Sequence, residues 1–243
     1  MKTLILRATN LKFRNRLRRL NLRIRPIRLS ITPSFLLTNL GRWRKSGLND
    51  TVWKIPAFSN FPVVDIGAYK GDFLSKRVKL EPKKMFFGYE PVHEFLAEAA
   101  KHFEGFENIF LYNYGLAASD KVTQFHLSGD ASGSSEDLQN TVKVTLKDIA
   151  NEMVFSNPIS LVICNIEGGE YELVNRLIEK NLIKNIEVLL LQFHDIGESS
   201  RRDMVNIRKL LARTHYSEFK YDFIWDAWVR KDLNKYEKDR ITL

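Results

Sequence analysis

The sequence predicts a mostly parallel, doubly wound α/β sheet of the Rossmann type that begins near residue 60 and ends in an antiparallel strand pair. From that point onward, short apolar runs alternate with amphipathic helical runs. A turn that contains glycines and an acid, Asp65–Gly71, directly follows the first apolar run. Two strand-like runs follow the last helical run, at residues 217–223 and 224–230. Strand–helix alternation of this length is typical of parallel sheets covered by helices on both faces.

Each element follows from the spacing of its apolar residues. Five buried strands are expected within short apolar runs at residues 61–67, 85–91, 108–115, 159–169 and 186–195. Four helices are expected where apolar residues recur every three or four positions, at residues 71–80, 92–103, 170–181 and 202–214. Residues 121–127 and 141–146 are predicted to form a hairpin or a pair of edge strands. The Ser-, Gly- and Asp-rich loop between them suits either a mobile connection or a lid.

The positive charge of the chain is concentrated at its N-terminus. The formal net charge is +9, yet residues 1–45 hold thirteen Lys and Arg and no acid, whereas residues 46–243 sum to −4. We therefore predict a basic N-terminal extension, residues 1–50, and a Rossmann-like domain, residues 51–243. The extension is expected to contain a short basic amphipathic helix that is either solvated or in contact with anionic membrane. We do not expect nucleic acid as a partner, because the domain itself is slightly acidic.

Other features of the sequence limit the class of protein. No apolar run approaches the ~20 residues that a transmembrane helix needs, and no signal peptide is expected, because Met1–Arg7 is followed by arginines. Cys164 is the single cysteine, which argues against a disulfide framework or a cysteine-rich zinc site. We expect Cys164 to pack in a strand core. A cytoplasmic protein is expected, with peripheral membrane contact as an option for the extension.

The turn after the first strand is the sharpest functional signal. Gly67 and Gly71 would let a ligand approach backbone N–H groups closely. The G-x-G-x-x-G spacing of a nicotinamide site is missing, and Asp65 would repel a pyrophosphate. An acid at this position suits a cationic ligand such as S-adenosylmethionine, with its sulfonium and amino groups. A glycine-rich turn in some other α/β protein is the competing interpretation.

Glu90 strengthens the prediction of a nucleoside site. It ends the second strand, twenty-five residues after Asp65. Nucleotide-binding α/β folds place there the acid that holds the ribose hydroxyls. The alternative is a solvated acid at a strand end. Together the acid–glycine turn, the spacing and the second acid favour a nucleoside ligand.

Six segments carry a resemblance to a known family. DIGAYKG, GYEPVHEF, NYGLAASD, VTLKDI, CNIEGGEYELV and LQFHDI occur here in the order found in the FkbM-type family of S-adenosylmethionine-dependent methyltransferases. The match runs from about Val63 to about Asp195 and leaves residues 1–50 uncovered. The resemblance implies a class I methyltransferase fold, S-adenosylmethionine as cofactor, and methylation of a hydroxyl on a sugar or secondary metabolite. The cofactor-binding residues that it implies are Asp65, Gly67 and Gly71 at the methionine part, Ala68 in the same turn, Glu90 at the ribose, and Asn113 and Ala117 beside the adenine.

The chain also departs from the family pattern. The fourth strand often ends in a Lys-x-Asp-x-Glu-Gly run, but Ile163 stands in place of the lysine and Asn165 in place of the aspartate. Gln192 replaces an acid that often precedes the histidine of the fifth strand. These replacements weaken the case for a metal-dependent or lysine-assisted mechanism, and no metal site is expected.

Methylation of a hydroxyl calls for a base near the sulfonium. His194 is the first candidate, since histidine titrates near neutrality, and Glu167 is the second; both are expected on the same rim as Asp65. A loop-bonding histidine and a helix-N-terminal acid are the competing interpretations. The leading function is therefore an O-methyltransferase for a sugar, glycan or related metabolite. The alternatives are a non-catalytic S-adenosylmethionine-binding module and, less favoured, a nicotinamide oxidoreductase.

Overall fold

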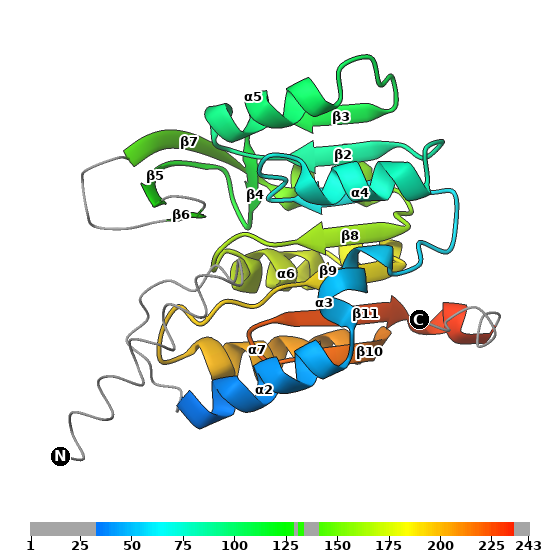
Figure 1. Ribbon diagram of the computed structural model, residues 1–243, viewed down its shortest axis with the longest axis vertical. Coiled ribbons are helices and arrows are strands. Elements are labelled where there is room, and N and C mark those ends of the chain that lie inside the picture. Colours follow the sequence, from blue (N-terminus) through cyan, green and yellow to red (C-terminus); the bar gives the residue numbers. More distant parts are fainter. Residues whose placement is uncertain (1–32, 129–130, 134–140, 236–243) are drawn as a thin grey trace.

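The computed structural model of the protein describes residues 33–128, 131–133 and 141–235. The basic amphipathic helix expected near the N-terminus lies outside these residues. A seven-stranded sheet forms the centre of the molecule, in the order β3-β2-β1-β8-β9-β11-β10 (Figure 1). Its strands are β1 Val63–Ile66, β2 Phe86–Tyr89, β3 Ile109–Tyr112, β8 Leu161–Cys164, β9 Val188–Leu191, β10 His215–Tyr221 and β11 Trp225–Arg230.

The sheet is mixed in the way that the sequence predicts. Strands β3, β2, β1, β8 and β9 are parallel to one another, and β11 is antiparallel to both β9 and β10. Counted in chain order, the seven strands are arranged 3-2-1-4-5-7-6. Strand order reverses between β1 and β8, and sheets of this kind bind ligands beyond the carboxyl ends of the strands at such a reversal. The predicted mostly parallel, doubly wound sheet with an antiparallel C-terminal pair is confirmed.

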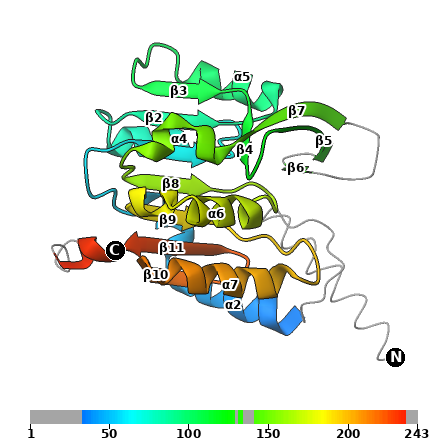
Figure 2. The same ribbon diagram turned by 180° about the vertical axis from the view of Figure 1, so that it is seen from behind.

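Helices cover both faces of the sheet, and α6 and α7 lie on the face opposite α4 and α5 (Figure 2). On one face Leu74 and Ala99 pack among the strands, and on the other face Val174 and Ile207 do so. Cys164 is buried in the strand core, as expected, and burial raises the pKa of its thiol. The four helices are α4 Asp72–Leu80, α5 His93–His102, α6 Glu170–Glu179 and α7 Ser200–Leu211.

A second, smaller sheet lies beside the carboxyl ends of β1 and β2 (Figure 1). Its strands, in the order β4-β7-β5-β6, are β4 Gly115–Ala117, β7 Thr141–Asp148, β5 Lys121–Ser128 and β6 Ala131–Gly133. The expected pairing of residues 121–127 with 141–146 is confirmed as the antiparallel β5–β7 pair. Part of the expected loop forms β6, which pairs with β5.

The third strand is shorter than the sequence predicts. It ends at Tyr112, and Gly115 begins β4 of the second sheet instead. The Asn113 amide donates hydrogen bonds to the carbonyl oxygens of Glu90 and Pro91, at 3.2 and 3.3 Å, and this holds the chain where it turns. The expected strand over residues 108–115 was therefore two elements, because a side-chain contact to the neighbouring strand end interrupts it.

The end of the predicted extension is folded against the main sheet. The helix α2 Pro33–Lys45 is followed by the short helices α3 Leu48–Thr51 and η1 Val52–Lys54. Trp43 is almost fully buried, and its ring packs on Phe219 and Tyr221 of β10 at centroid distances of 5.9 and 5.2 Å. The division of the chain at residue 50 stays a prediction, since residues 1–32 are not among the described residues. Among the described helices, none has the length and apolar character needed to cross a bilayer.

Candidate active site

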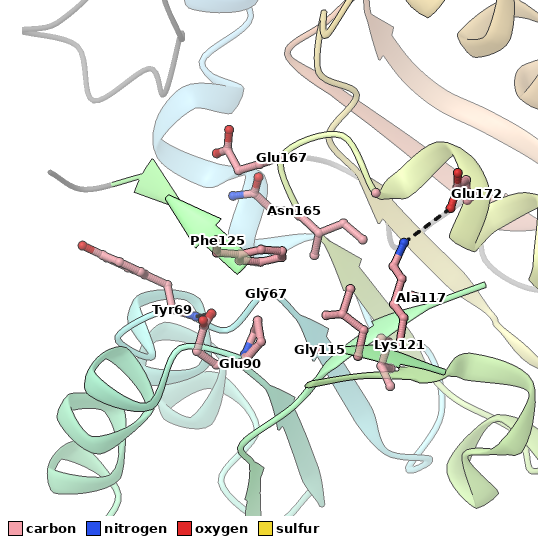
Figure 3. Close-up of a pocket in the computed structure, with 15 residues that line it drawn as sticks. Gly67, Tyr69, Glu90, Gly115, Ala117, Lys121, Phe125, Asn165, Glu167 and Glu172 are labelled. Atoms are coloured by element: carbon pink, nitrogen blue, oxygen red, sulfur yellow. Dashed lines mark hydrogen bonds and ion pairs between the residues drawn. The ribbon is translucent and has the colours of Figure 1, made fainter. Parts of the chain in front are cut away.

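A pocket opens at the carboxyl ends of β1, β2 and β8 and extends toward the second sheet (Figure 3). The turn after β1 contributes Gly67, the end of β2 contributes Glu90, and the segment after β8 contributes Asn165 and Glu167. Phe125 of β5 lies between these groups. The empty volume, including the part open to solvent, is about 690 Å³. This size falls within the range of small-molecule and cofactor pockets.

Gly67 follows β1 and lies against the backbone of the segment that follows β8. Its φ is +86°, and a Cβ atom built there would lie 2.3 Å from the backbone oxygen of Asn165. The N–H groups of Gly67 and Ala68 both donate to the Tyr89 carbonyl, at 2.9 and 3.0 Å. Gly67 is thus required by packing between strand ends, in addition to any ligand contact.

Gly71 and Ala68 lie away from the pocket surface. Gly71 precedes α4 with φ +81°, and a Cβ atom there would lie 2.8 Å from the ring of Phe103. Ala68 is buried in the hydrophobic core. Both residues therefore shape the turn through packing, and their contact with a cofactor stays a prediction.

Asp65 is a buried carboxyl at the end of β1. Only 2% of the residue is exposed, and its Oδ2 has no hydrogen-bond partner among the described residues. Burial, with a further contribution from the nearby Glu90 charge, raises the pKa of Asp65 to about 7. A buried polar atom without a partner is costly, so this carboxylate would gain from a cationic or hydrogen-bond-donating ligand.

Glu90 organises the first two strand ends. Its Oε2 accepts the N–H of Tyr69 and its Oε1 accepts the N–H of Val92, both at 2.9 Å. Tyr69 has φ +51°, so the chain leaves β1 in a left-handed turn that directs its N–H at Glu90. A carboxylate has about four acceptor positions, so these two bonds are compatible with holding a ribose diol as well.

Asn165 has a role that the sequence did not reveal. Asn165 stands in place of a family aspartate, yet it lines the pocket, and its buried Oδ1 has no hydrogen-bond partner among the described residues. Its N–H donates to the Ile66 carbonyl at 3.0 Å, which fixes the residue beside the end of β1. The side-chain oxygen therefore remains a hydrogen-bond acceptor at the pocket, as an aspartate would be.

The two residues expected beside the adenine are separated by the structure. Ala117 lines the pocket. Asn113 is exposed and holds the chain turn described above, with its Oδ1 3.3 Å from Nδ1 of His93. A direct contact between Asn113 and the adenine stays a prediction.

Glu167 and His194 come together, as expected for neighbouring strand ends. Nε2 of His194 lies 3.6 Å from Oε1 of Glu167. Glu167 lines the pocket, whereas His194 lies behind it and is 8% exposed. The catalytic roles of both residues stay predictions.

Sequence reasoning missed three further polar residues of this region. Glu170, the first residue of α6, is fully buried against His194. Lys121 and Glu172 line the pocket at its far end and form an ion pair at 4.0 Å (Figure 3). The acid at the start of the 170–181 helix was the available signal for Glu170, but only the fold shows what it contacts.

The comparison with known families decides the identity of the domain. The model of the methyltransferase FkbM domain matches residues 65–223. The chain belongs to this family. S-adenosylmethionine is the cofactor of these methyltransferases. The family match and the observed sheet confirm the predicted class I methyltransferase fold. A comparison with curated protein sequences finds no match.

Several solved structures resemble the FkbM-family chain at low identity. A fibrillarin/Nop5p complex has 11% identity and a TM-score of 0.46, covering 77% of this chain and 82% of that chain. The ribosomal protein L11 methylase of Lactobacillus delbrueckii subsp. bulgaricus has 13% identity and a TM-score of 0.45, covering 77% and 78%. The magnesium protoporphyrin IX methyltransferase of Synechocystis PCC 6803, with bound SAM, has 12% identity and a TM-score of 0.42, covering 94% and 96%. Similarity at this level says nothing about the acceptor.

The residues at this FkbM-family pocket fit the cofactor: Asn165 and Glu90 line it, and Asp65 is buried at the end of β1 and is not among the lining residues. The unpartnered oxygens of Asp65 and Asn165 are acceptors at the ends of the adjacent strands β1 and β8, and they suit an ammonium group. Glu90, at the end of β2, suits a vicinal diol. Ile163, which stands in place of the family lysine, is buried in the core. A lysine-assisted mechanism at that position is therefore not available to this chain.

Replacing Glu90 with glutamine is expected to weaken S-adenosylhomocysteine binding at least tenfold. The amide loses one acceptor oxygen and the charge that strengthens hydrogen bonds to hydroxyls, and about 1.4 kcal/mol corresponds to a factor of ten. Titration calorimetry measures the affinity, with Glu94→Gln on the exposed first turn of α5 as the matched control. Equal affinities for the Glu90 variant and the wild type would refute the assignment of the ribose site.

Proposed function

We propose that this chain is an O-methyltransferase that transfers the methyl group of S-adenosylmethionine to a hydroxyl of a sugar, glycan or related metabolite. The observation that carries the proposal is the arrangement of acceptor oxygens at three adjacent strand ends. Asp65 and Asn165 supply buried oxygens without partners, and Glu90 supplies a carboxylate held by two backbone N–H groups. The resemblance of the sequence to hydroxyl-methylating members of the family supports the class of acceptor.

The cofactor, when bound, supplies an electrophilic methyl group on a sulfonium. The chain must then bind the acceptor hydroxyl nearby and take up its proton. Glu167 is placed for this, because it lines the pocket and its Oε1 lies 3.6 Å from Nε2 of His194. Phe125 contributes an apolar surface to the same pocket, which favours an acceptor with an apolar face.

Transfer of a radiolabelled methyl group to a panel of hydroxyl compounds tests this proposal. We expect incorporation into methyl glycosides or oligosaccharides, and retention of the label after treatment with base, as ethers require. Cofactor binding without incorporation into any member of the panel would favour the non-catalytic module instead. That alternative rests on Asn165 and Gln192, which stand in place of family acids.

We also propose that the basic extension contacts anionic membrane. Basic residues near an anionic surface contribute about 1 kcal/mol each at close range, and ten of the thirteen in residues 1–45 precede α2. Co-sedimentation with vesicles containing phosphatidylserine at physiological salt is expected for the full chain and not for a variant that lacks residues 1–32. The cut precedes Pro33, because Trp43 of α2 belongs to the core. Equal sedimentation of both proteins would contradict this proposal.

A further inference from the structure

Glu170 is a fully buried carboxylate that bonds to two segments at once. Its Oε2 accepts the N–H of Gly168 at 2.7 Å, and its Oε1 accepts the N–H of His194 at 2.7 Å. The same Oε1 lies 3.2 Å from the ring atom Nδ1 of His194. Glu170 therefore joins the turn after β8, the segment after β9 and the start of α6.

The turn that Glu170 holds has an unusual backbone. Glu167 has φ +52° and Gly168 has φ +111°, and a Cβ atom on Gly168 would lie 2.8 Å from the side chain of Ile196. A non-glycine residue in the left-handed region is uncommon and is maintained by its surroundings. The bond from Glu170 to the Gly168 N–H provides such a restraint and directs Glu167 toward the pocket.

The contacts of His194 determine where its ring carries a proton. A carboxylate oxygen beside Nδ1 favours the tautomer with hydrogen on Nδ1. Nε2 is then an acceptor that faces Oε1 of Glu167 across 3.6 Å, which is longer than a hydrogen bond. Two facing acceptors of this kind can share one added proton. Other titratable groups near this pair, within the part of the chain that the structure describes, include Tyr171, whose hydroxyl donates to the His194 carbonyl at 2.6 Å. Cys164 lies near both Glu170 and Asp65, and the buried Asp195 follows His194 and lies near Tyr171.

We propose that Glu170 is a positioning residue that prepares Glu167 and His194 to take up one proton from the acceptor hydroxyl. The inference rests on the proposed function. As the bond between the acceptor oxygen and the methyl carbon forms and the bond from that carbon to sulfur breaks, the hydroxyl proton would pass to Glu167 and on to Nε2 of His194, which leaves Glu167 ionised again. The imidazolium that results lies between two carboxylates, Glu167 and Glu170, and is stabilised by both.

Glu170→Gln tests this role, and Glu179→Gln, an exposed acid on the same helix, is the matched control. Nitrogen-15 NMR of the full chain, with the His194 signal assigned by its loss in His194→Gln, reports the tautomer and pKa of the ring. We expect the Nδ1–H tautomer in the wild type and a fall of at least one unit in the His194 pKa in Glu170→Gln. The control should match the wild type. An Nε2–H tautomer in the wild type, or an unchanged pKa in Glu170→Gln, would overturn the proposal.

If Glu170→Gln does not fold, Glu167→Gln provides the second measurement, and the His194 pKa should fall there too. An unchanged pKa in that variant would also overturn the proposal.

Turnover of the best hydroxyl compound should fall at least a hundredfold in kcat for Glu170→Gln, with KM within threefold of wild type. An equal fall in the control would count against a positioning role. Absence of turnover by the wild type would reject the proposed function, whereas the tautomer result would stand separately.

Discussion

Replacing Asp65 with asparagine is expected to stabilise the protein above pH 7 and to abolish its response to S-adenosylhomocysteine. Burial raises the pKa of Asp65 from 3.8 to about 7. The folded state therefore holds a proton that the unfolded state has released between about pH 4 and pH 7. Stability from this group is complete below pH 4 and is lost as the pH rises to about 7. The loss amounts to roughly 4 kcal/mol, as an upper limit.

Urea denaturation at pH 5 and pH 8 measures this effect without any ligand. Asparagine has nearly the same shape and no charge, so the stability of the variant relative to wild type should increase with pH by a few kcal/mol. Asp72→Asn, at an exposed position on the first turn of α4, should show no such trend. If the difference in stability between variant and wild type is the same at both pH values, the pKa of Asp65 is not raised by folding.

The same residue links pH to cofactor binding. The ionised form is the one that attracts a cation, so the affinity for S-adenosylhomocysteine, whose amino group is positive, should rise between pH 6 and pH 8. A hundredfold excess of ligand over its dissociation constant stabilises the wild type by ~2.7 kcal/mol, and Asp65→Asn should lose this shift. A full ligand-induced shift in the variant would remove Asp65 from the site.

Gly67→Ala is expected to destabilise the protein by about 2–5 kcal/mol. A positive φ costs an L-residue roughly 1–2 kcal/mol, and the added Cβ atom would lie 2.3 Å from a backbone oxygen. Relief of that overlap requires β1 and β8 to separate at the pocket, and overpacking of this kind costs ~1–3 kcal/mol. Binding of S-adenosylhomocysteine should weaken together with stability.

Gly105→Ala separates the cost of the positive φ from the cost of the overlapping Cβ atom. Gly105 has φ +83°, but nothing lies within 4 Å of a Cβ atom built there. Only the cost of the positive φ applies, so the free energy of unfolding of this variant should fall by about 1–2 kcal/mol in the same urea denaturation experiment. Equal losses at Gly67 and Gly105 would show that the contact with Asn165 is not a constraint.

The spacing of apolar residues predicted most of the strands and helices, because that spacing depends on local secondary structure. The apolar runs at β1, β8 and β9 and the helical spacing of Ala99 and Phe103 needed no knowledge of tertiary contacts. The acids Asp65 and Glu90 could be predicted as a pair because parallel strands bring their carboxyl ends to one edge of the sheet. The resemblance to a family then predicted the cofactor, which the periodicity of apolar residues alone does not identify.

The missed features depend on contacts between distant residues. β4 begins at Gly115, which pairs with Leu146 thirty-one residues later and lies so close to it that an added Cβ atom would be 2.5 Å from the Leu146 side chain. Trp43 lies in a segment that composition marked as basic, yet it packs against β10. Asn165 stands in place of a family acid, and only the fold shows that its side-chain oxygen lies at the pocket. The role of Glu170 follows only from its hydrogen bonds to the N–H groups of Gly168 and His194.

A crystal structure of the full chain with S-adenosylhomocysteine tests the central claim most directly. We expect one ligand molecule per chain in the pocket, with its ribose hydroxyls within hydrogen-bond distance of the Glu90 carboxylate. Its amino group should lie within hydrogen-bond distance of Asp65 Oδ2 or Asn165 Oδ1. A ligand bound elsewhere, or one in this pocket with its ribose directed away from Glu90, would contradict the site.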